Sequence, residues 1–286
     1  MDTFTRDGLT FDVTDSGPTA GEVVILLHGF PQDRTCWDQV APLLNEAGLR
    51  TLAPDQRGYS PGARPKSRFA YTMREVAADA LALADAAGAE RFHVVGHDWG
   101  GAAAWYLAQH HAARVRTVTS LSTPHPDALA WSFTHSSQGL KSWYMLFFQL
   151  PWVPEHLAPR TLRKTFADSG LPRAAAVRYA DRFSTPESLT GPMGWYRSML
   201  ADPGMRRAVL PRGTVAWPKG GSPHHRVQVP ATYVWGREDF ALGRAAADKT
   251  AEFVSADYEF VELDAGHWLP DTHAPEVTEA ILARIR

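Results

Sequence analysis

The segment from Val94 to Gly101, which reads Val-Val-Gly-His-Asp-Trp-Gly-Gly, constrains the fold of this 286-residue chain most strongly. It continues a short apolar segment, Arg91 to Val95, and leads into an alanine-rich helical run, Ala102 to His111. Strand, sharp turn and helix in this order form the context of a turn G-x-nucleophile-x-G, which exposes a reactive side chain. The glycines allow a strained turn and a close approach of helix to strand. The central residue is Asp98, and a carboxylate there indicates attack on a saturated carbon rather than ordinary acyl transfer.

The rest of the chain alternates strand-like and helical segments. Residues 3–15 alternate apolar and polar side chains around Asp7-Gly8 and predict an opening β-hairpin. Val23 to Leu27 is a continuous apolar run, as expected of a strand buried on both faces of a mostly parallel sheet. Further strands are expected at residues 50–53, 115–121, 231–235 and 258–263, and helices at residues 36–47, 71–87, 242–254 and 275–286. This alternation predicts an α/β fold with a doubly wound, mostly parallel sheet.

The alternation breaks after Pro124. Residues 125–225 are rich in Trp, Tyr, Phe, Met and Pro, and they contain helix-like pieces but no clear apolar strand. We therefore expect a helical cap over residues 125–225, inserted after the sixth strand. The core then consists of residues 1–124 and 226–286.

Bulk properties limit the classes of partner. A hydrophobic content of 44% and a charged content of 21% are ordinary for a globular protein, and the net charge of −2 disfavours nucleic acid. The single cysteine, Cys36, cannot form an internal disulfide, which fits a reducing compartment. The first residues do not resemble a signal peptide, and no run reaches the roughly 18 apolar residues of a membrane span. We expect a cytoplasmic monomer or homodimer that does not bind membranes.

A nucleophile at such a turn needs a base and an acid that orients the base. In α/β folds with this turn, the three residues follow one another along the chain in the order nucleophile, acid, histidine. The candidate base is His267, just beyond the last expected strand. The candidate acid is Asp239, which follows the penultimate strand, with Glu238 as its solvated neighbour. A plain helix N-cap is the alternative role for Asp239. An acid could also follow the strand expected at residues 115–121. The sequence there is Ser122-Thr123-Pro124 and holds no carboxylate.

A second G-x-S-x-G pattern, Gly58-Tyr59-Ser60-Pro61-Gly62, would by itself suggest a serine esterase. The residue after the nucleophile has to donate its N–H to the oxyanion, and Pro61 has none. No helix is expected to begin there either. We therefore do not expect Ser60 to be a nucleophile. The corresponding donors for Asp98 are the backbone N–H groups of Trp99 and Phe30.

Five segments together resemble the α/β-hydrolase fold epoxide hydrolases, a group related to the haloalkane dehalogenases. They are His28-Gly29-Phe30-Pro31, Asp55-Gln56-Arg57-Gly58-Tyr59-Ser60, Gly96-His97-Asp98-Trp99-Gly100-Gly101, Trp235-Gly236-Arg237-Glu238-Asp239 and Gly266-His267-Trp268. The resemblance spans almost the whole chain. It implies an α/β-hydrolase core with a helical cap, and a triad of Asp98, Asp239 and His267.

The resemblance also implies two cap tyrosines, Tyr144 and Tyr196, that hydrogen-bond the epoxide oxygen. Opening an epoxide creates an alkoxide, whose conjugate acid has a pKa well above that of a phenol, so a phenol of pKa about 10 can donate to it. The alternative role of both tyrosines is aromatic packing within the cap. Cap aromatics near them, expected to line an apolar substrate pocket, are Trp143, Phe147, Phe148 and Trp195.

These features predict an epoxide hydrolase that converts an apolar epoxide to a diol. Two alternatives stay open: a haloalkane dehalogenase with the same triad, and a non-catalytic ligand-binding protein of the same fold. A halide needs no proton when it leaves, so the two tyrosines favour epoxide. No cofactor is expected, because the sequence shows neither a phosphate-binding glycine loop nor a metal-ligand spacing.

Overall fold

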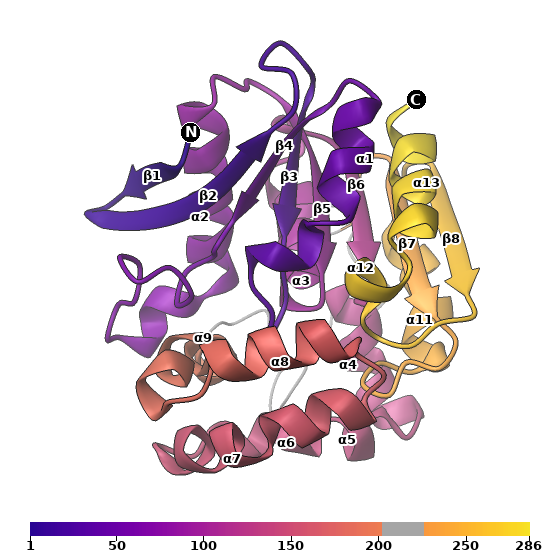
Figure 1. Ribbon diagram of the computed structural model, residues 1–286. Coiled ribbons are helices and arrows are strands. Elements are labelled where there is room, and N and C mark those ends of the chain that lie inside the picture. Colours follow the sequence, from indigo (N-terminus) through magenta and orange to yellow (C-terminus); the bar gives the residue numbers. More distant parts are fainter. Residues whose placement is uncertain (202–225) are drawn as a thin grey trace.

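The computed structural model describes residues 1–201 and 226–286. Eight strands form one sheet in the order β1-β2-β4-β3-β5-β6-β7-β8 (Figure 1). β1 and β2 are an antiparallel hairpin, β2 is antiparallel to β4, and all other neighbours are parallel. The mostly parallel sheet is therefore confirmed. The strands are β1 (Thr3–Arg6), β2 (Leu9–Ser16), β3 (Val23–Leu27), β4 (Arg50–Pro54), β5 (Phe92–His97), β6 (Val115–Leu121), β7 (Ala231–Gly236) and β8 (Tyr258–Leu263).

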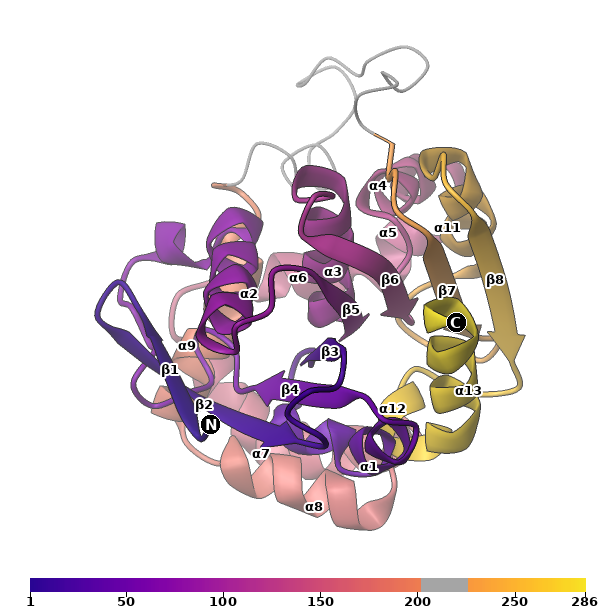
Figure 2. The ribbon, with the colours of Figure 1, turned by 90° about the horizontal axis from the view of Figure 1, so that it is seen from above.

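Helices cover both faces of this sheet. All residues of β3, β4, β5 and β7 are buried, and in β3 every residue is apolar, as expected of a strand covered on both faces. α1 (Val40–Glu46) and α13 (Ala274–Ile285) pack together on one face (Figure 2). α2 (Met73–Ala86) and α3 (Trp99–His110) pack together on the other face. α11 (Arg244–Lys249) lies near β8, the edge strand of the sheet.

The helix predicted over residues 36–47 is two separate elements. The 3₁₀ turn η1 (Arg34–Trp37) begins at Asp33, whose side chain accepts a hydrogen bond from the Thr35 amide. α1 begins only at Val40. Pro42 lies in its first turn, where the missing N–H costs nothing, but the proline ring prevents the helix from extending back through Asp38.

Between β6 and β7, the described residues up to Ala201 form helices and loops. The helices are α4 (Pro126–His135), α5 (Gln138–Lys141), α6 (Trp143–Phe147), α7 (Val153–Asp168), α8 (Arg173–Arg182) and α9 (Pro186–Ser198). They lie across the carboxyl ends of the strands (Figure 1). The predicted cap, residues 125–225, ends in a stretch outside the described residues, so its boundaries and those of the core stay a prediction. In the part of the chain that is described, no helix is long and apolar enough to cross a membrane.

The order of the strands reverses between β3 and β5. From β3 the chain continues to β4 on one side, whereas from β5 it continues through β6, β7 and β8 on the other. Doubly wound sheets bind their ligands outside the carboxyl ends of the strands at such a point. Here the loop that begins at His28, after β3, meets Asp98, after β5.

Candidate active site

Asp98 stands at the sharp turn between β5 and α3. Its backbone has φ 50° and ψ −119°, an unusual conformation for a residue with a side chain. Two glycines make the turn possible. A Cβ on Gly96 would lie 2.1 Å from the carbonyl oxygen of Gly100, and a Cβ on Gly100 would lie 2.0 Å from that of Leu27. Only glycine at these positions lets α3 pack this closely against β3 and β5.

The carboxylate of Asp98 is held by the loop after β3. Its Oδ1 accepts a hydrogen bond of 2.8 Å from the backbone N–H of Phe30, one of the two predicted oxyanion donors. Burial disfavours the charge, but His267, His97 and the Phe30 amide outweigh burial and lower the pKa of Asp98. The carboxylate of Asp98 is therefore ionised at neutral pH. The second predicted donor, Trp99, is the first residue of α3, and the role of its N–H stays a prediction.

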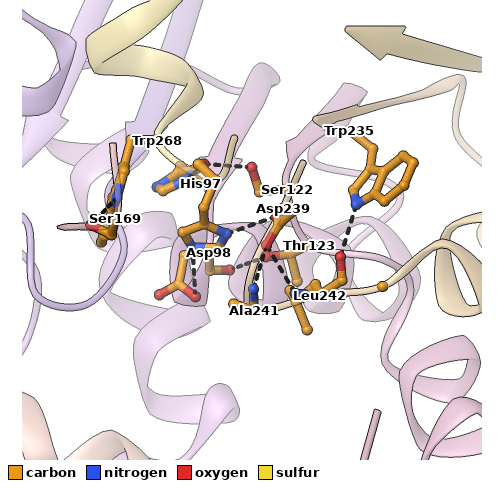
Figure 3. A network of polar contacts seen from close by, with 12 residues as sticks. His97, Asp98, Ser122, Thr123, Ser169, Trp235, Asp239, Ala241, Leu242 and Trp268 are labelled. Atoms are coloured by element: carbon orange, nitrogen blue, oxygen red, sulfur yellow. Dashed lines mark hydrogen bonds and ion pairs between the residues drawn. The ribbon is translucent and has the colours of Figure 1, made fainter. Parts of the chain in front are cut away.

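His267 and Asp239 form a buried pair, and Figure 3 shows Asp239 beside Ala241 and Leu242. Nδ1 of His267 lies 2.8 Å from Oδ2 of Asp239, and Oδ1 of Asp239 accepts from the backbone N–H groups of Ala241 and Leu242 at 2.8 and 2.9 Å. One oxygen of Asp239 thus accepts from a turn and the other lies against the histidine, whereas the helix N-cap considered for it is not found, because the N-cap of α11 is Gly243. The neighbouring Glu238 is exposed.

The charge on His267 follows from its position between two carboxylates. Its Nε2 lies 3.7 Å from Oδ2 of Asp98, beyond hydrogen-bond length. Burial lowers the pKa of His267, but the carboxylates of Asp239 and Asp98 outweigh burial and raise it to about 10. The imidazole is therefore protonated in the resting site.

An aromatic cluster from the cap and the core contains Tyr144, Tyr196, Phe148, Phe30 and Trp99. The ring of Tyr196 lies 6.1 Å from that of Tyr144, 4.8 Å from Phe148, 5.1 Å from Phe30 and 4.9 Å from Trp99. Burial raises the pKa of both tyrosines, and the negative charge of Asp98 adds to the shift. Both phenols are consequently protonated and able to donate at neutral pH.

The four predicted pocket aromatics take different places. Phe148 belongs to the aromatic cluster, and Phe147 is half-buried beside it. Trp195 is buried, with its ring 5.8 Å from that of Trp99 and its Nε1 donating to the carbonyl of Arg57. Trp143 is 64% exposed and is not brought to the cluster. It precedes Tyr144 on a helix, where successive side chains point about 100° apart.

The structure gives Ser60 a structural role. Its hydroxyl donates to the carbonyl of Asp55 at 2.7 Å and accepts from the amide of Asp12 at 2.9 Å. The serine is fully buried. The first hydrogen bond closes the loop after β4 on itself, and the second ties this loop to β2.

Two residues that support the site were missed as site residues in the sequence. The hydroxyl of Ser122 and Nε2 of His97 lie 2.7 and 2.8 Å from the carbonyl oxygen of His267. Ser122 occupies the place after β6 where a carboxylate was sought, so the position itself was the signal. Within residues 1–201 and 226–286, no group of three His, Cys, Asp or Glu side chains is arranged to hold a metal ion.

Comparison with known proteins agrees with this geometry. The family model described as alpha/beta hydrolase fold matches residues 22–274. The chain is 31% identical to an AB hydrolase superfamily protein of Bacillus subtilis, over 98% of this chain and 96% of the relative. It is 32% identical to Epoxide hydrolase A of Mycobacterium tuberculosis, over 96% of this chain and 94% of the relative.

A solved structure, described among novel epoxide hydrolases in metagenomes from hot environments, superposes with a TM-score of 0.82 at 27% identity. The match covers 99% of this chain and 97% of that one. The chain belongs to the alpha/beta hydrolase fold family, and within it to the branch that its epoxide hydrolase relatives represent.

Proposed function

We propose that the protein is an epoxide hydrolase that converts an apolar epoxide to a vicinal diol through an alkyl ester on Asp98. The observation that carries this proposal is the carboxylate of Asp98, bound at Oδ1 by the Phe30 amide at 2.8 Å, with Nε2 of His267 3.7 Å from its Oδ2. Tyr144 and Tyr196 provide phenols close enough for the charge of Asp98 to act on them. The similarity to named epoxide hydrolases over nearly the whole chain supports the same function.

In the first half-reaction, Asp98 attacks one oxirane carbon. The carbon–oxygen bond of the ring breaks as the new ester bond forms, and negative charge develops on the ring oxygen. Tyr144 and Tyr196 donate hydrogen bonds to this oxygen. Because burial moves their pKa values toward that of the alkoxide, proton transfer to the oxygen is close to balanced.

Ester formation then changes His267 from an acid to a base. The ester removes the negative charge of Asp98, which is one of the two charges that raise the pKa of His267. The imidazolium can now release its proton, which restores the tyrosine or reaches the alkoxide directly. The site is left with a neutral ester, a neutral imidazole and a neutral hydroxyl group.

In the second half-reaction, neutral His267 takes a proton from water while the water oxygen attacks the ester carbonyl. The resulting oxyanion forms on the oxygen bound by Phe30, with Trp99 as the proposed second donor, and one such donor is typically worth about 2.7–4 kcal/mol. Collapse breaks the acyl carbon–oxygen bond, and the departing alkoxide takes the proton of the regenerated carboxyl group. Asp98 is again ionised and His267 again protonated.

The test is a panel of aryl, alkyl and terminal epoxides with several haloalkanes, assayed for diol and for halide. Diol without halide supports the proposal, and halide release would instead identify a dehalogenase. Turnover of neither class would indicate a ligand-binding protein.

One turnover in water enriched in oxygen-18 tests the ester. The heavy oxygen is expected in Asp98 and not in the first diol, because water attacks the acyl carbon. Heavy oxygen in the first diol would exclude the ester route.

A further inference from the structure

A chain of buried polar side chains runs from cap helix α8 to the backbone of His267. The hydroxyl of Tyr179, on α8, lies 3.1 Å from Oδ1 of Asp271, and Oδ2 of Asp271 lies 2.7 Å from Nε2 of Gln32. Oε1 of Gln32 lies 2.7 Å from Nδ1 of His97, whose Nε2 lies 2.8 Å from the carbonyl oxygen of His267. Gln32 and His97 are fully buried, and Asp271 is 9% exposed.

Counting donors shows that this chain needs one proton shared between His97 and Asp271. The carbonyl of His267 only accepts, so Nε2 of His97 carries a hydrogen. If Asp271 is ionised, it takes the N–H of Gln32, and the amide oxygen then requires a second hydrogen on His97. If His97 is neutral, its Nδ1 is an acceptor, so the Gln32 amide has to be flipped with its N–H toward His97. The amide oxygen then faces Asp271 and requires a hydrogen there. Without the shared proton, two acceptors face each other somewhere in the chain, at the cost of a buried unsatisfied group.

When the chain of hydrogen bonds holds this proton, below about pH 6, the surroundings place it on Asp271 rather than on His97. Burial and the neighbouring His267 lower the pKa of His97 to about 4, although Asp98 and Asp239 oppose this. Burial also raises the pKa of Asp271 to about 6, against its hydrogen bonds with Gln32 and Tyr179 and the charge of Arg178. The other titratable groups that act on Asp271 are Asp33, which raises its pKa, and the buried Cys36.

With the proton on Asp271, all donors point in one direction. Arg178 donates to the hydroxyl of Tyr179, which donates to Asp271. Asp271 then donates to Gln32, Gln32 to His97 and His97 to the carbonyl of His267. Hydrogen bonds aligned in this way polarise and strengthen one another.

We propose that His97, Gln32 and Asp271 are positioning residues that couple the seating of cap helix α8 to the placement of His267. The coupling operates through one proton shared along the chain. The effect on turnover rests on the proposed epoxide hydrolysis, whereas the effect on stability does not.

The stability test compares Asp271→Asn with Asp271→Leu by thermal unfolding across pH. The folded pKa of Asp271 is raised from 3.8 to about 6, so the stability of the unsubstituted protein should fall as pH rises through this range. Asp271→Asn supplies an N–H to Gln32 at any pH, so its Tm should exceed that of the unsubstituted protein by several degrees at neutral pH. Asp271→Leu should have a lower Tm than Asp271→Asn at every pH.

The control is Asp264→Asn, which removes an 81% exposed carboxylate just after β8 and should follow the unsubstituted protein. If Asp271→Asn destabilises the protein at neutral pH as much as Asp271→Leu, Asp271 serves as the ion-pair partner of Arg178, and the shared proton is excluded. That ion pair spans 3.6 Å.

The catalytic test measures ester hydrolysis in a single turnover. The ratio of the Asp271→Asn rate to the unsubstituted rate should rise from about one at low pH to several-fold at high pH, while ester formation changes less. A ratio that stays constant across pH overturns the positioning role. If the unsubstituted protein forms neither ester nor diol from any epoxide, the proposed function fails, and the stability comparison still decides whether the proton is shared.

Discussion

At the scale of single residues, the order of steps in the proposed ester mechanism depends on the proton of His267. A protonated imidazole cannot activate water, and His267 stays protonated until Asp98 loses its charge. Ester formation therefore has to precede activation of water. This sequence keeps water from being activated before the substrate has reacted.

Replacing His267 should separate the two half-reactions. His267→Gln leaves Asp98 and both tyrosines in place, so the ester should form and persist. Mass spectrometry after incubation with an epoxide should show the mass of one substrate added to the peptide that contains Asp98. His273→Gln, in the next loop, is the control and should turn over without an adduct. No adduct with His267→Gln would exclude a covalent intermediate.

The same pKa predicts how stability depends on pH. A folded pKa of about 10 lies above the unfolded value, so His267 contributes stability that is complete below about pH 6.5 and is lost toward pH 10. The loss is on the order of a few kcal/mol. Urea unfolding should show a decline over this range for the unsubstituted protein and a flatter profile for His267→Gln. Equal slopes would contradict a protonated resting imidazole.

The two cap tyrosines should act on ester formation. The double variant Tyr144→Phe and Tyr196→Phe keeps the rings but removes both donors, so the rate of alkylation should fall by about 100-fold or more. Rapid-mixing measurement of adduct formation gives this rate directly. Tyr258→Phe is the control, because that buried hydroxyl has no hydrogen-bond partner in the described part of the chain. An unchanged rate in the double variant would assign the tyrosines to packing alone.

Candidate site residues that are indicated by their immediate sequence neighbours were predictable from the sequence. Asp98 lies between glycines in a strand–turn–helix segment, and Asp239 and His267 follow apolar strands, so position along the chain was enough to indicate them. The support from Gln32 and Asp271 was not predictable in this way. These two residues lie far apart in sequence and meet only because the loop after β3 and the short helix α12 (Leu269–Thr272), which follows β8, converge.

At the scale of elements, the predicted strands agree with the structure within a residue or two, whereas helices differ more at their ends. Buried parallel strands must be apolar throughout, and this leaves a continuous signal. Helix ends depend on single side chains such as the Asp33 cap and Pro42. The helices between β6 and β7 had the weakest signal, because the sequence indicated only helix-like pieces there and gave no bounds for them.

The close packing of α3 on β3 requires glycine at position 100, and this requirement can be tested. Gly100→Ala would place a methyl group 2.0 Å from the carbonyl oxygen of Leu27, and backbone on both sides limits relaxation. We expect a loss of about 3 kcal/mol or more, or failure to fold, measured by thermal unfolding and soluble yield. Gly266→Ala is the matched control, since a Cβ there meets nothing within 4 Å. Equal stability of the two variants would contradict the close approach.

At the scale of the whole molecule, the site lies between parts that are held together by polar contacts. Trp195 on α9 donates to Arg57 of the core, and Trp268 of the core donates to Ser169 after α7. Arg182 on α8 contacts both Asp33 and Asp55, at 3.1 and 2.8 Å. The cap therefore contributes Tyr144 and Tyr196 at fixed positions relative to Asp98 only while these contacts persist.

Arg182 gives the sharpest test of this dependence. Asp33 and Asp55 are almost fully buried, so Arg182→Met would leave buried negative charge only partly balanced by Arg34 on Asp55. We expect the free energy of unfolding in urea to fall by about 3 kcal/mol. The control Arg163→Met breaks an exposed pair with Asp181 and should cost less than about 1 kcal/mol. A loosened α8 also displaces Tyr179, where the chain of hydrogen bonds that leads to His267 begins. Ester hydrolysis should therefore slow in Arg182→Met and not in Arg163→Met. Equal unfolding energies for the two variants would show that the cap is held by its apolar contacts alone.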